Sequence, residues 1–457
     1  MQLDMTKGSP FRLIIKFIIP VVLGNLFQQL YSMVDTIIVG RCVGMDALAA
    51  VGATGTISFL ILGFALGLTS GFTVLTAQKF GAGDIKGMKL SVTNALILSF
   101  LVSVIMTFFS VIGMRGLLRL MNTPDNIFEM SYDYIIIIVG GMFFTILYNI
   151  MASLLRAVGN SKAPFYFLVV SAVLNIVLDL VLIRNFNMGV KGAAYATIIS
   201  QAISGILCVI YTLKKVDILV PGREERRADS QCIKNQLGVG IPMALQFSIT
   251  AVGTMIAQAA LNLFGSTVVA SYTAATKACQ FATLPYGAVG STMATYCAQN
   301  RGINDIDRIK KGVRIAGIIS SIYSAIIYAV AMLTLSPLMK LFFDTSSGID
   351  FEEVLGYGRT YMLVAGTCFI PLGLIFIYRN AMQGCGYSLL AMLGGVVELI
   401  SRAIIAFVAT RLHSYVGVCW ADPATWLVTG IFLMFSYYYT VRVMIRDKTR
   451  FEADRGN

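Results

Sequence analysis

Residues 18–35 read Ile-Ile-Pro-Val-Val-Leu-Gly-Asn-Leu-Phe-Gln-Gln-Leu-Tyr-Ser-Met-Val-Asp, and they decide what kind of protein this is. A helix needs about 20 mostly apolar residues to cross a bilayer, and this apolar run extends from residue 14 to residue 40. It is too long for the apolar region of a cleaved signal peptide. The run contains a carboxylic acid, Asp35, which is costly in lipid and therefore predicts a functional site.

The composition of the whole chain agrees with a membrane protein. Of its 457 residues 57% are hydrophobic and only 13% are charged, whereas a soluble domain has about 25% charged residues. These values exclude a soluble enzyme, a nucleic-acid-binding protein and a disordered protein. Eight cysteines without a Cys-x-x-Cys pair and a single histidine, His413, predict no disulfide framework, no zinc site and no cofactor. We interpret His413 as a loop residue.

Further apolar runs follow the first, separated by charged residues, glycine or proline. They predict an all-α protein with twelve membrane-spanning helices near residues 14–40, 48–77, 91–114, 131–152, 165–184, 192–212, 236–264, 268–297, 313–336, 355–377, 389–410 and 422–441. Most Lys and Arg residues fall in the loops on one side, where we also place Arg379. The positive-inside rule then places both termini in the cytoplasm, and it explains the net charge of +12.

The two halves of the chain resemble each other. A hydrophilic stretch at 213–235 separates an N-terminal lobe, residues 1–212, from a C-terminal lobe, residues 236–441, and a tail follows at 442–457. Ile-Pro20 corresponds to Ile-Pro242, and Gly159 corresponds to Gly386. Gln78-x-x-Gly81-x-x-Asp84 corresponds to Gln299-x-x-Gly302-x-x-Asp305. Six helices per lobe predict two pseudo-symmetric bundles around a central cleft, an arrangement that suits alternating access.

Polar side chains surround Asp35 on one face of its predicted helix. Gln28, Tyr31, Ser32 and Asp35 recur at three- and four-residue spacing, which brings them to the same face. We expect this face to line the cleft and to include candidates for substrate binding. Pro20, earlier on the same helix, removes a backbone hydrogen bond and permits a bend there.

A second acid, Asp179, lies four residues after Asn175 and therefore on the same helical face. The following span begins with small residues from Gly192, which permit close packing and would bring Thr197 near Asp179. Carboxylate, amide and hydroxyl oxygens suit a hard cation such as Na⁺, and two adjacent carboxylates can instead hold a proton. The alternative is that Asn175 and Asp179 only cross-link helices.

The C-terminal lobe carries charges of both signs within its spans. Glu398 and Arg402 are four residues apart, and we interpret them as a structural ion pair. Lys277 has no acid on its own span. It could pair with Glu398 or contact an anionic group of a substrate in the cleft, and the sequence does not decide between these alternatives.

Taken together, these features resemble the multidrug and toxic compound extrusion (MATE) family along essentially the full chain. The resemblance rests on Ile-Pro20, Tyr31-Ser-Met-Val-Asp35, Ala49-Ala-Val-Gly52, the Asn175/Asp179 pair and Gly192-Ala-Ala-Tyr-Ala-Thr197, together with the duplicated Gln-x-x-Gly-x-x-Asp motif. It implies an antiporter of a prokaryotic plasma membrane that exports organic cations or other amphipathic compounds in exchange for H⁺ or Na⁺.

The resemblance further implies a cation-coupling site at Asp35, Asn175, Asp179 and Thr197, as in the DinF-like branch, with a helix bend at Pro20. The chain departs from the branch with an acid on the seventh span, where Gln246, Ser248 and Thr250 stand. We expect a monomer that is not an enzyme. The rival functions are a lipid-linked oligosaccharide flippase of the same superfamily, which should line its cleft with more cations, a membrane enzyme, and a channel or receptor.

Overall fold

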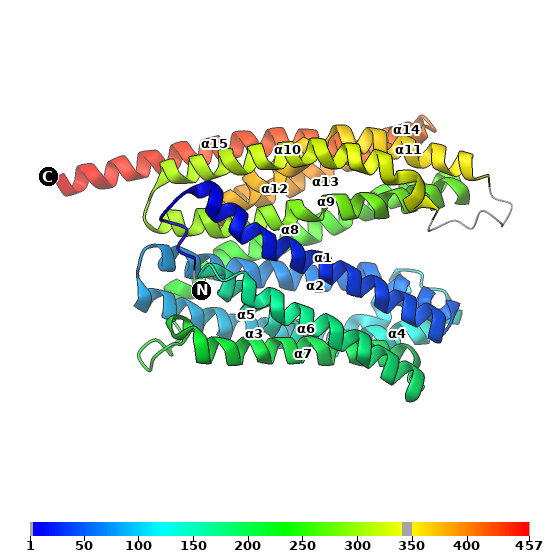
Figure 1. Ribbon diagram of the computed structural model, residues 1–457, viewed down its shortest axis with the longest axis horizontal. Coiled ribbons are helices and arrows are strands. Elements are labelled where there is room, and N and C mark those ends of the chain that lie inside the picture. Colours follow the sequence, from blue (N-terminus) through cyan, green and yellow to red (C-terminus); the bar gives the residue numbers. More distant parts are fainter. Residues whose placement is uncertain (1–2, 341–349, 457) are drawn as a thin grey trace. The chain divides into compact units, whose positions relative to one another are not determined.

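The computed structural model describes residues 3–340 and 350–456, and every regular element in these ranges is a helix (Figure 1). The all-α prediction is therefore confirmed. In chain order the helices are α1 (Pro10–Cys42), α2 (Met45–Gly81), α3 (Ile85–Leu120), α4 (Asp125–Gly140), α5 (Met142–Ala157), α6 (Lys162–Asp179), η1 (Leu180–Asn185), α7 (Gly189–Lys215), η2 (Asp217–Leu219), α8 (Ser230–Leu261), η3 (Asn262–Phe264), α9 (Ser266–Gly302), α10 (Ile306–Met339), α11 (Phe351–Thr367), α12 (Phe369–Gly384), α13 (Ser388–Arg411), α14 (Tyr415–Cys419) and α15 (Ala421–Gly456).

Two of the predicted spans are broken helices. Nine helices of the described part are long and apolar enough to cross a membrane singly, and two bent pairs raise the total to eleven. α4 and α5 meet at an angle of 47°, and α11 and α12 meet at 48°, where the sequence suggested uninterrupted helices at 131–152 and 355–377. The first break lies at Gly141, where a Cβ atom would stand 2.5 Å from Ile198, so α7 approaches the backbone too closely for a side chain.

The remaining predicted span, 268–297, belongs to α9. This helix has 37 residues and is as long as α2. It is less apolar than its neighbours because it contains Lys277, Pro285 and many Ser, Thr and Gln residues. These polar groups explain why hydropathy alone does not identify α9 as a membrane span.

The repeated Gln-x-x-Gly-x-x-Asp motif forms the same local structure twice. Asp84 caps α3 by accepting a hydrogen bond from the Gly87 N–H at 2.8 Å, and Asp305 caps α10 by accepting one from the Arg308 N–H at 2.9 Å. The residue before each aspartate has a positive φ, 71° at Gly83 and 55° at Asn304. The paired bends in α4–α5 and α11–α12 give further support to an internal duplication.

The chain divides into two compact units. Unit 1 comprises the chain start to Lys7 and residues 16–247, and unit 2 comprises residues 8–15 and 248–457. α8 therefore contributes to both units, whereas the sequence boundaries at 212/213 and 235/236 divide it between the linker and the second lobe. α7 also extends to Lys215 and α8 begins at Ser230, so the linker between them is shorter than 213–235. At the other end, α15 continues through the predicted tail.

Glycine contacts explain why the first half of α8 belongs to unit 1. A Cβ atom on Gly71 of α2 would stand 2.4 Å from Cα of Gly240, and one on Gly67 would stand 2.6 Å from Cα of Ala244. Both helices thus present small residues at four-residue spacing, the pattern that permits close backbone packing of membrane helices.

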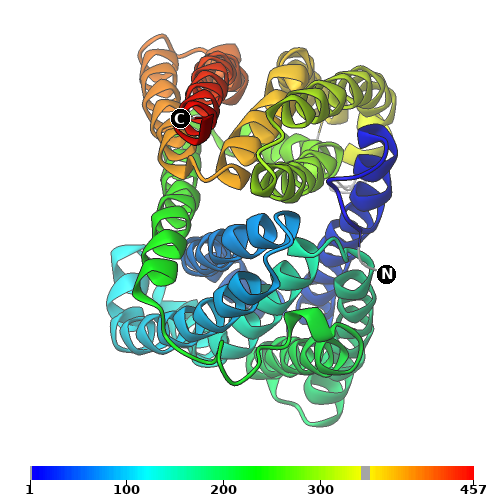
Figure 2. The same cartoon turned by 90° about the vertical axis from the view of Figure 1, so that its left-hand side faces the viewer.

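Each unit has its own packed interior. In unit 1, α2 packs on α3 and α5, and α7 packs on α5 and α6 (Figure 1). In unit 2, α9 packs on α10 and α12, and α15 packs on α12 and α13 (Figure 2). Two of the predicted site residues lie on these central helices, Asp179 in unit 1 and Arg402 in unit 2, and both side chains are buried.

Candidate functional site

The two acids predicted in the N-terminal half meet inside unit 1. Asp35 of α1 is 8% exposed and Asp179 of α6 is fully buried. The two carboxyl groups are neighbours. Beside them the Asn175 side-chain amide donates a long hydrogen bond of 3.5 Å to the hydroxyl of Thr197. The structure thus brings together all four residues that the sequence proposed as a cluster.

Local helix geometry accounts for this meeting. Asn175 and Asp179 are one turn apart, and α6 passes at Asp179 into the π-helical segment η1. π-Helical turns are rare and occur frequently at functional sites. Gly192 of α7 lies against η1, since a Cβ atom there would stand 3.2 Å from the carbonyl carbon of Leu182. The small residue lets α7 approach α6, which brings Thr197 to Asn175.

This cluster contains buried oxygen atoms that accept no hydrogen bond. Among the described residues, the buried side-chain atoms that lack a hydrogen-bond partner include Oδ1 of Asp35, Oδ1 of Asn175 and both carboxylate oxygens of Asp179. Unpaired buried polar atoms are uncommon in proteins and call for an explanation. All four atoms are acceptors, so a proton or a metal cation would satisfy them. The described residues contain no group of three or more His, Cys, Asp or Glu side chains that could hold a metal ion, so a cation here would also need the neutral oxygens.

Only part of the polar face of α1 contacts other polar side chains. The Tyr31 hydroxyl lies near the side chains of Gln28 and of Gln201 on α7. Ser32 is exposed, and its carbonyl oxygen accepts a hydrogen bond from the Thr36 hydroxyl at 2.8 Å. Gln201 was missed in the sequence, although its position four residues after Thr197 places it on the same helical face.

Pro20 lies within α1, ten residues after the helix begins, and its side chain is buried. The helix continues through it to Cys42. Proline removes one backbone hydrogen bond from a helix, so this position remains the weakest point of α1. The predicted bend at Pro20 stays a prediction.

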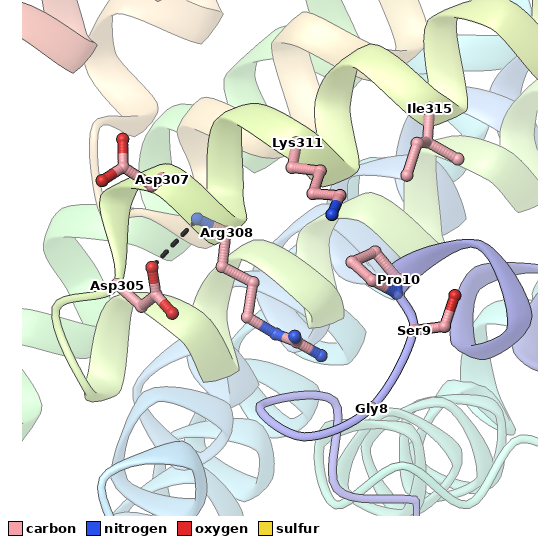
Figure 3. A pocket seen from close by; sticks show the side chains of 8 residues that line it. All are labelled: Gly8, Ser9, Pro10, Asp305, Asp307, Arg308, Lys311 and Ile315. Carbon is pink, nitrogen blue, oxygen red and sulfur yellow. Dashed lines mark hydrogen bonds between the residues drawn. The ribbon is translucent and has the colours of Figure 1, made fainter.

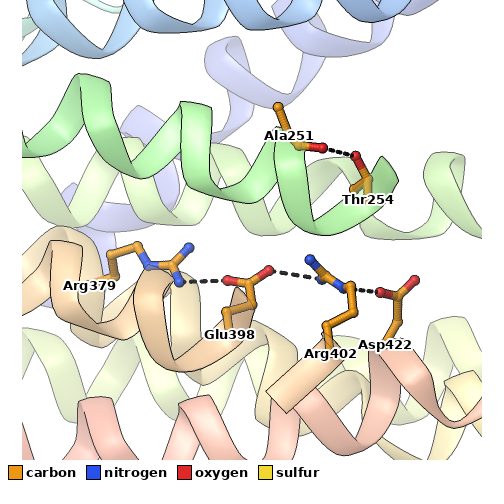
Figure 4. Close-up of polar contacts among 6 residues, drawn as sticks. All are labelled: Ala251, Thr254, Arg379, Glu398, Arg402 and Asp422. Carbon is orange, nitrogen blue, oxygen red and sulfur yellow. Dashed lines mark hydrogen bonds and ion pairs between the residues drawn. The ribbon is translucent and has the colours of Figure 1, made fainter. Parts of the chain in front are cut away.

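In unit 2 four charged side chains form a chain of ion pairs, in which three are buried and the fourth, Asp422, is half-buried (Figure 4). Arg402 Nη2 donates to Glu398 Oε1 at 3.0 Å, as the four-residue spacing suggested, and Arg402 Nε donates to Asp422 Oδ1 at 2.8 Å. Arg379 Nη2 donates to the other oxygen of Glu398 at 2.9 Å. We call Arg379, Glu398, Arg402 and Asp422 the four-charge network. It ties α12, α13 and α15 together.

One sequence expectation needs correction here, and one of the two alternatives left open for Lys277 is excluded. Arg379 was placed in a cytoplasmic loop, but it lies in α12 and is only 6% exposed, because Glu398 supplies a partner inside the bundle. Lys277 does not pair with Glu398, whose two oxygens already accept from arginines. Its side chain is exposed on α9. Neither Arg379 nor Asp422 has its partner on its own helix, so helical spacing gives no signal for these contacts.

A surface cavity of about 450 Å³ lies elsewhere in unit 2, at the first turns of α1 and α10 (Figure 3). Two of the charged residues that line the cavity already make contacts with neighbouring residues. Asp305 caps α10, and Asp307 pairs with Lys310 outside the cavity at 2.6 Å. None of the predicted site residues lines it.

Comparison with known proteins identifies the family. The MatE family profile matches residues 20–181 and 242–408, which include most of each half of the chain. This chain belongs to the MatE family. The match covers Pro20, Asp35 and Asp179 in one half and Glu398 and Arg402 in the other. Members of this family are transporters, so multidrug transport is favoured over a flippase or an enzyme.

Full-length relatives agree with this assignment. The chain is 27% identical over 446 residues to the probable multidrug resistance protein YoeA of Bacillus subtilis, with 95% of each chain covered. It is 30% identical over 420 residues to the probable multidrug resistance protein YpnP of the same organism, with 90% of each covered. A solved outward-facing structure of a multidrug resistance MATE family transporter matches with a TM-score of 0.89 at 22% identity, covering 96% of this chain and 98% of that one. The MatE chain therefore has the twelve-helix membrane fold, with α9 among its spans.

Proposed function

We propose that this MatE protein is a secondary antiporter that exports organic cations or other amphipathic compounds in exchange for H⁺ or Na⁺. The observation that carries the proposal is the meeting of Asp35 and Asp179 in unit 1, with four buried acceptor oxygens that have no donor. Two adjacent carboxylates repel each other when both are ionised. A single small cation removes this repulsion, which makes the cluster a suitable coupling site.

Coupling requires that the ion and the substrate favour different states of the protein. A ligand with equal affinity for two states cannot shift the balance between them. In our proposal, binding of H⁺ or Na⁺ to the cluster discharges Asp35 and Asp179 and favours a state in which α1 bends at Pro20. A cationic substrate would prefer the ionised cluster. Competition for one negative charge would thus drive the exchange by alternating access.

Both termini would then lie in the cytoplasm of a prokaryotic cell, and the protein would work as a monomer. Gln28 and Tyr31 on the polar face of α1 are the candidates for substrate contact in unit 1, since Tyr31 lies beside Asp35. The oxygen ligands of the cluster serve H⁺ and Na⁺ equally well by their chemistry, so the coupling ion has to be found by experiment.

The test is transport in proteoliposomes of purified protein, with a pH gradient or a Na⁺ gradient imposed separately and a fluorescent organic cation as the probe. Wild-type protein should move the dye with one gradient and not without it. Asp35→Asn keeps the size of the side chain and removes the charge, and it should reduce gradient-driven transport at least tenfold.

Asp46→Asn is the matched control, because Asp46 is a nearby but exposed acid in the first turn of α2. It should transport like the wild type. Full gradient-driven transport by Asp35→Asn would overturn the coupling role of the cluster. Dye movement that ignores both gradients in the wild type would instead indicate a channel.

A further inference from the structure

Unit 2 contains buried arginine donors that the four-charge network leaves unpaired. Arg402 uses Nη2 and Nε on Glu398 and Asp422, but its Nη1 is buried and has no partner among the described residues. Arg379 uses Nη2 on Glu398, and its Nε is likewise buried and unpaired. Both side chains are deeply buried, with Arg402 3% exposed and Arg379 6% exposed.

Such donors are costly. A buried donor without an acceptor costs about 1–3 kcal/mol, and more when it is charged. The two acids of the network cannot relieve this cost, because Glu398 already accepts from both arginines and Asp422 accepts from Arg402 Nε. The unpaired charged groups of unit 1 are oxygen acceptors, whereas those of unit 2 are nitrogen donors. A ligand that suits unit 2 must therefore accept hydrogen bonds.

The unpaired Arg402 nitrogen faces α8. A Cβ atom on Gly253 would stand 2.4 Å from Arg402 Nη1, so the guanidinium tip lies directly against this glycine. Figure 4 shows that tip pointing toward the α8 ribbon, where the Thr254 hydroxyl donates a hydrogen bond to the Ala251 carbonyl at 2.7 Å. A glycine at this position leaves the donor free of any side chain from α8.

We propose that Arg402 Nη1, beside Gly253, binds a small monovalent anion in unit 2. The ligand would be a halide or the carboxylate group of an organic solute, both of which accept charge-assisted hydrogen bonds from guanidinium. The four-charge network is neutral, with two arginines and two acids. A monovalent anion therefore adds one charge next to two guanidinium groups, whereas a divalent phosphate would add two and approach Glu398 and Asp422 with greater repulsion.

The experiment uses the full chain in detergent. Its only two tryptophans, Trp420 and Trp426, both lie in unit 2, so intrinsic fluorescence reports on that unit. Sodium chloride and sodium acetate are titrated separately at constant ionic strength, with the bulkier methanesulfonate as the balancing anion. A saturable change with chloride supports a halide site, and one with acetate supports a carboxylate site. No saturable change with either anion overturns the proposal.

Gly253→Ala tests the location, because its methyl group would occupy the space at Nη1 without changing any charge. The apparent affinity should fall at least tenfold. Gly238→Ala is the matched control on the same helix, since a Cβ atom there meets no atom within 4 Å. Equal affinities of these two variants would refute the site at Arg402.

Two further variants and one control serve if Gly253→Ala fails to fold. Asp422→Asn removes a negative charge beside Arg402 while keeping an acceptor for Arg402 Nε, so anion affinity should rise, and an unchanged or lower affinity contradicts the proposal. Arg402→Lys should weaken binding, and Arg411→Lys should not, because Arg411 lies exposed at the end of the same helix over the ring of Phe407. All readouts are binding measurements, so their failure leaves the proposed exchange in unit 1 untouched.

Discussion

At the scale of single residues, the two units differ in which buried charged atoms lack a hydrogen-bond partner. Asp35 and Asp179 of unit 1 leave oxygens unpaired, and Arg379 and Arg402 of unit 2 leave nitrogens unpaired. In unit 2 every acid oxygen of Glu398 is nevertheless occupied, so this acid cannot exchange ions without breaking two bonds. Our proposal therefore assigns cation coupling to unit 1, where the unpaired acid oxygens lie.

Glu398 should be important for stability. Glu398→Gln would leave Arg379 and Arg402 without their shared counter-charge, and breaking a buried ion pair by removing one partner costs about 3–5 kcal/mol. We expect a clear fall in the thermal unfolding midpoint of the purified protein. Glu129→Gln is the control, because the Glu129–Arg115 pair is exposed and such pairs contribute about 0–1 kcal/mol. Equal midpoints for the two variants would contradict a structural role of the network.

Gly71 should tolerate no side chain. In Gly71→Ala the new Cβ would stand 2.4 Å from Cα of Gly240, which is backbone and cannot turn aside. Overpacking of this kind costs about 1–3 kcal/mol, so thermal stability should fall. Gly55→Ala on the same helix meets no atom within 4 Å and should be neutral or slightly stabilising, because alanine favours helix. A neutral Gly71→Ala would show that α2 and α8 do not pack this closely.

At the scale of the elements, the duplicated caps decide where α3 and α10 begin. The Asp84 carboxylate accepts from the Lys79 ammonium at 2.8 Å and from the Gly87 N–H at 2.8 Å. These two contacts hold the pKa of Asp84 below its ordinary value. Because the folded-state pKa is depressed, the contribution of Asp84 to stability is complete above its ordinary value of 3.8 and is lost as the pH falls through the depressed one.

The cap and the ion pair can be separated by substitution. Asp84→Ala removes both and should cost about 1 kcal/mol, whereas Asp84→Asn keeps a good capping side chain and should cost only a few tenths. The measurement is thermal unfolding at neutral pH, repeated as the pH falls below 3.8. The difference between wild type and Asp84→Asn should shrink at acid pH. A difference that grows with acid would contradict the assigned contacts.

The bends at Gly141 and Cys368 are, after the helix caps, the second structural feature that both halves of the chain contain. Each divides one membrane span into two helices of nearly equal length, α4 with α5 and α11 with α12. Because the second bend brings a separate helix, α12, into the interior of unit 2, Arg379 can reach Glu398 from it. A broken span thus positions part of the four-charge network.

At the scale of the whole molecule, the distribution of basic residues predicts the orientation in the membrane. With the exposed Cys42 replaced by serine, Arg223→Cys in the loop before α8 should react with a membrane-impermeant thiol reagent only in inverted vesicles. His413→Cys in the loop between α13 and α14 should react only in intact cells. The opposite labelling pattern would reverse the orientation and would contradict cytoplasmic termini.

Much of the fold and of the candidate site was already determined by the sequence. The apolar runs predicted the membrane helices, because a bilayer imposes their length and hydrophobicity. Helical periodicity predicted that Asn175 and Asp179 share a face and that Glu398 and Arg402 can pair, because these relations lie within one helix. The small residues after Gly192 correctly predicted the approach of α7 to α6.

Only the tertiary structure decided the contacts between helices. Arg379 and Asp422 joined the four-charge network, and Gln201 joined Tyr31, through helices that are distant in sequence. α8 belongs partly to unit 1 because Gly67 and Gly71 admit its backbone. Spacing along a chain specifies which residues of one helix share a face, but the partner of that face depends on how separate helices pack. For this reason the acids could be located from the sequence, whereas the buried arginine that neutralises Glu398 from α12 could not.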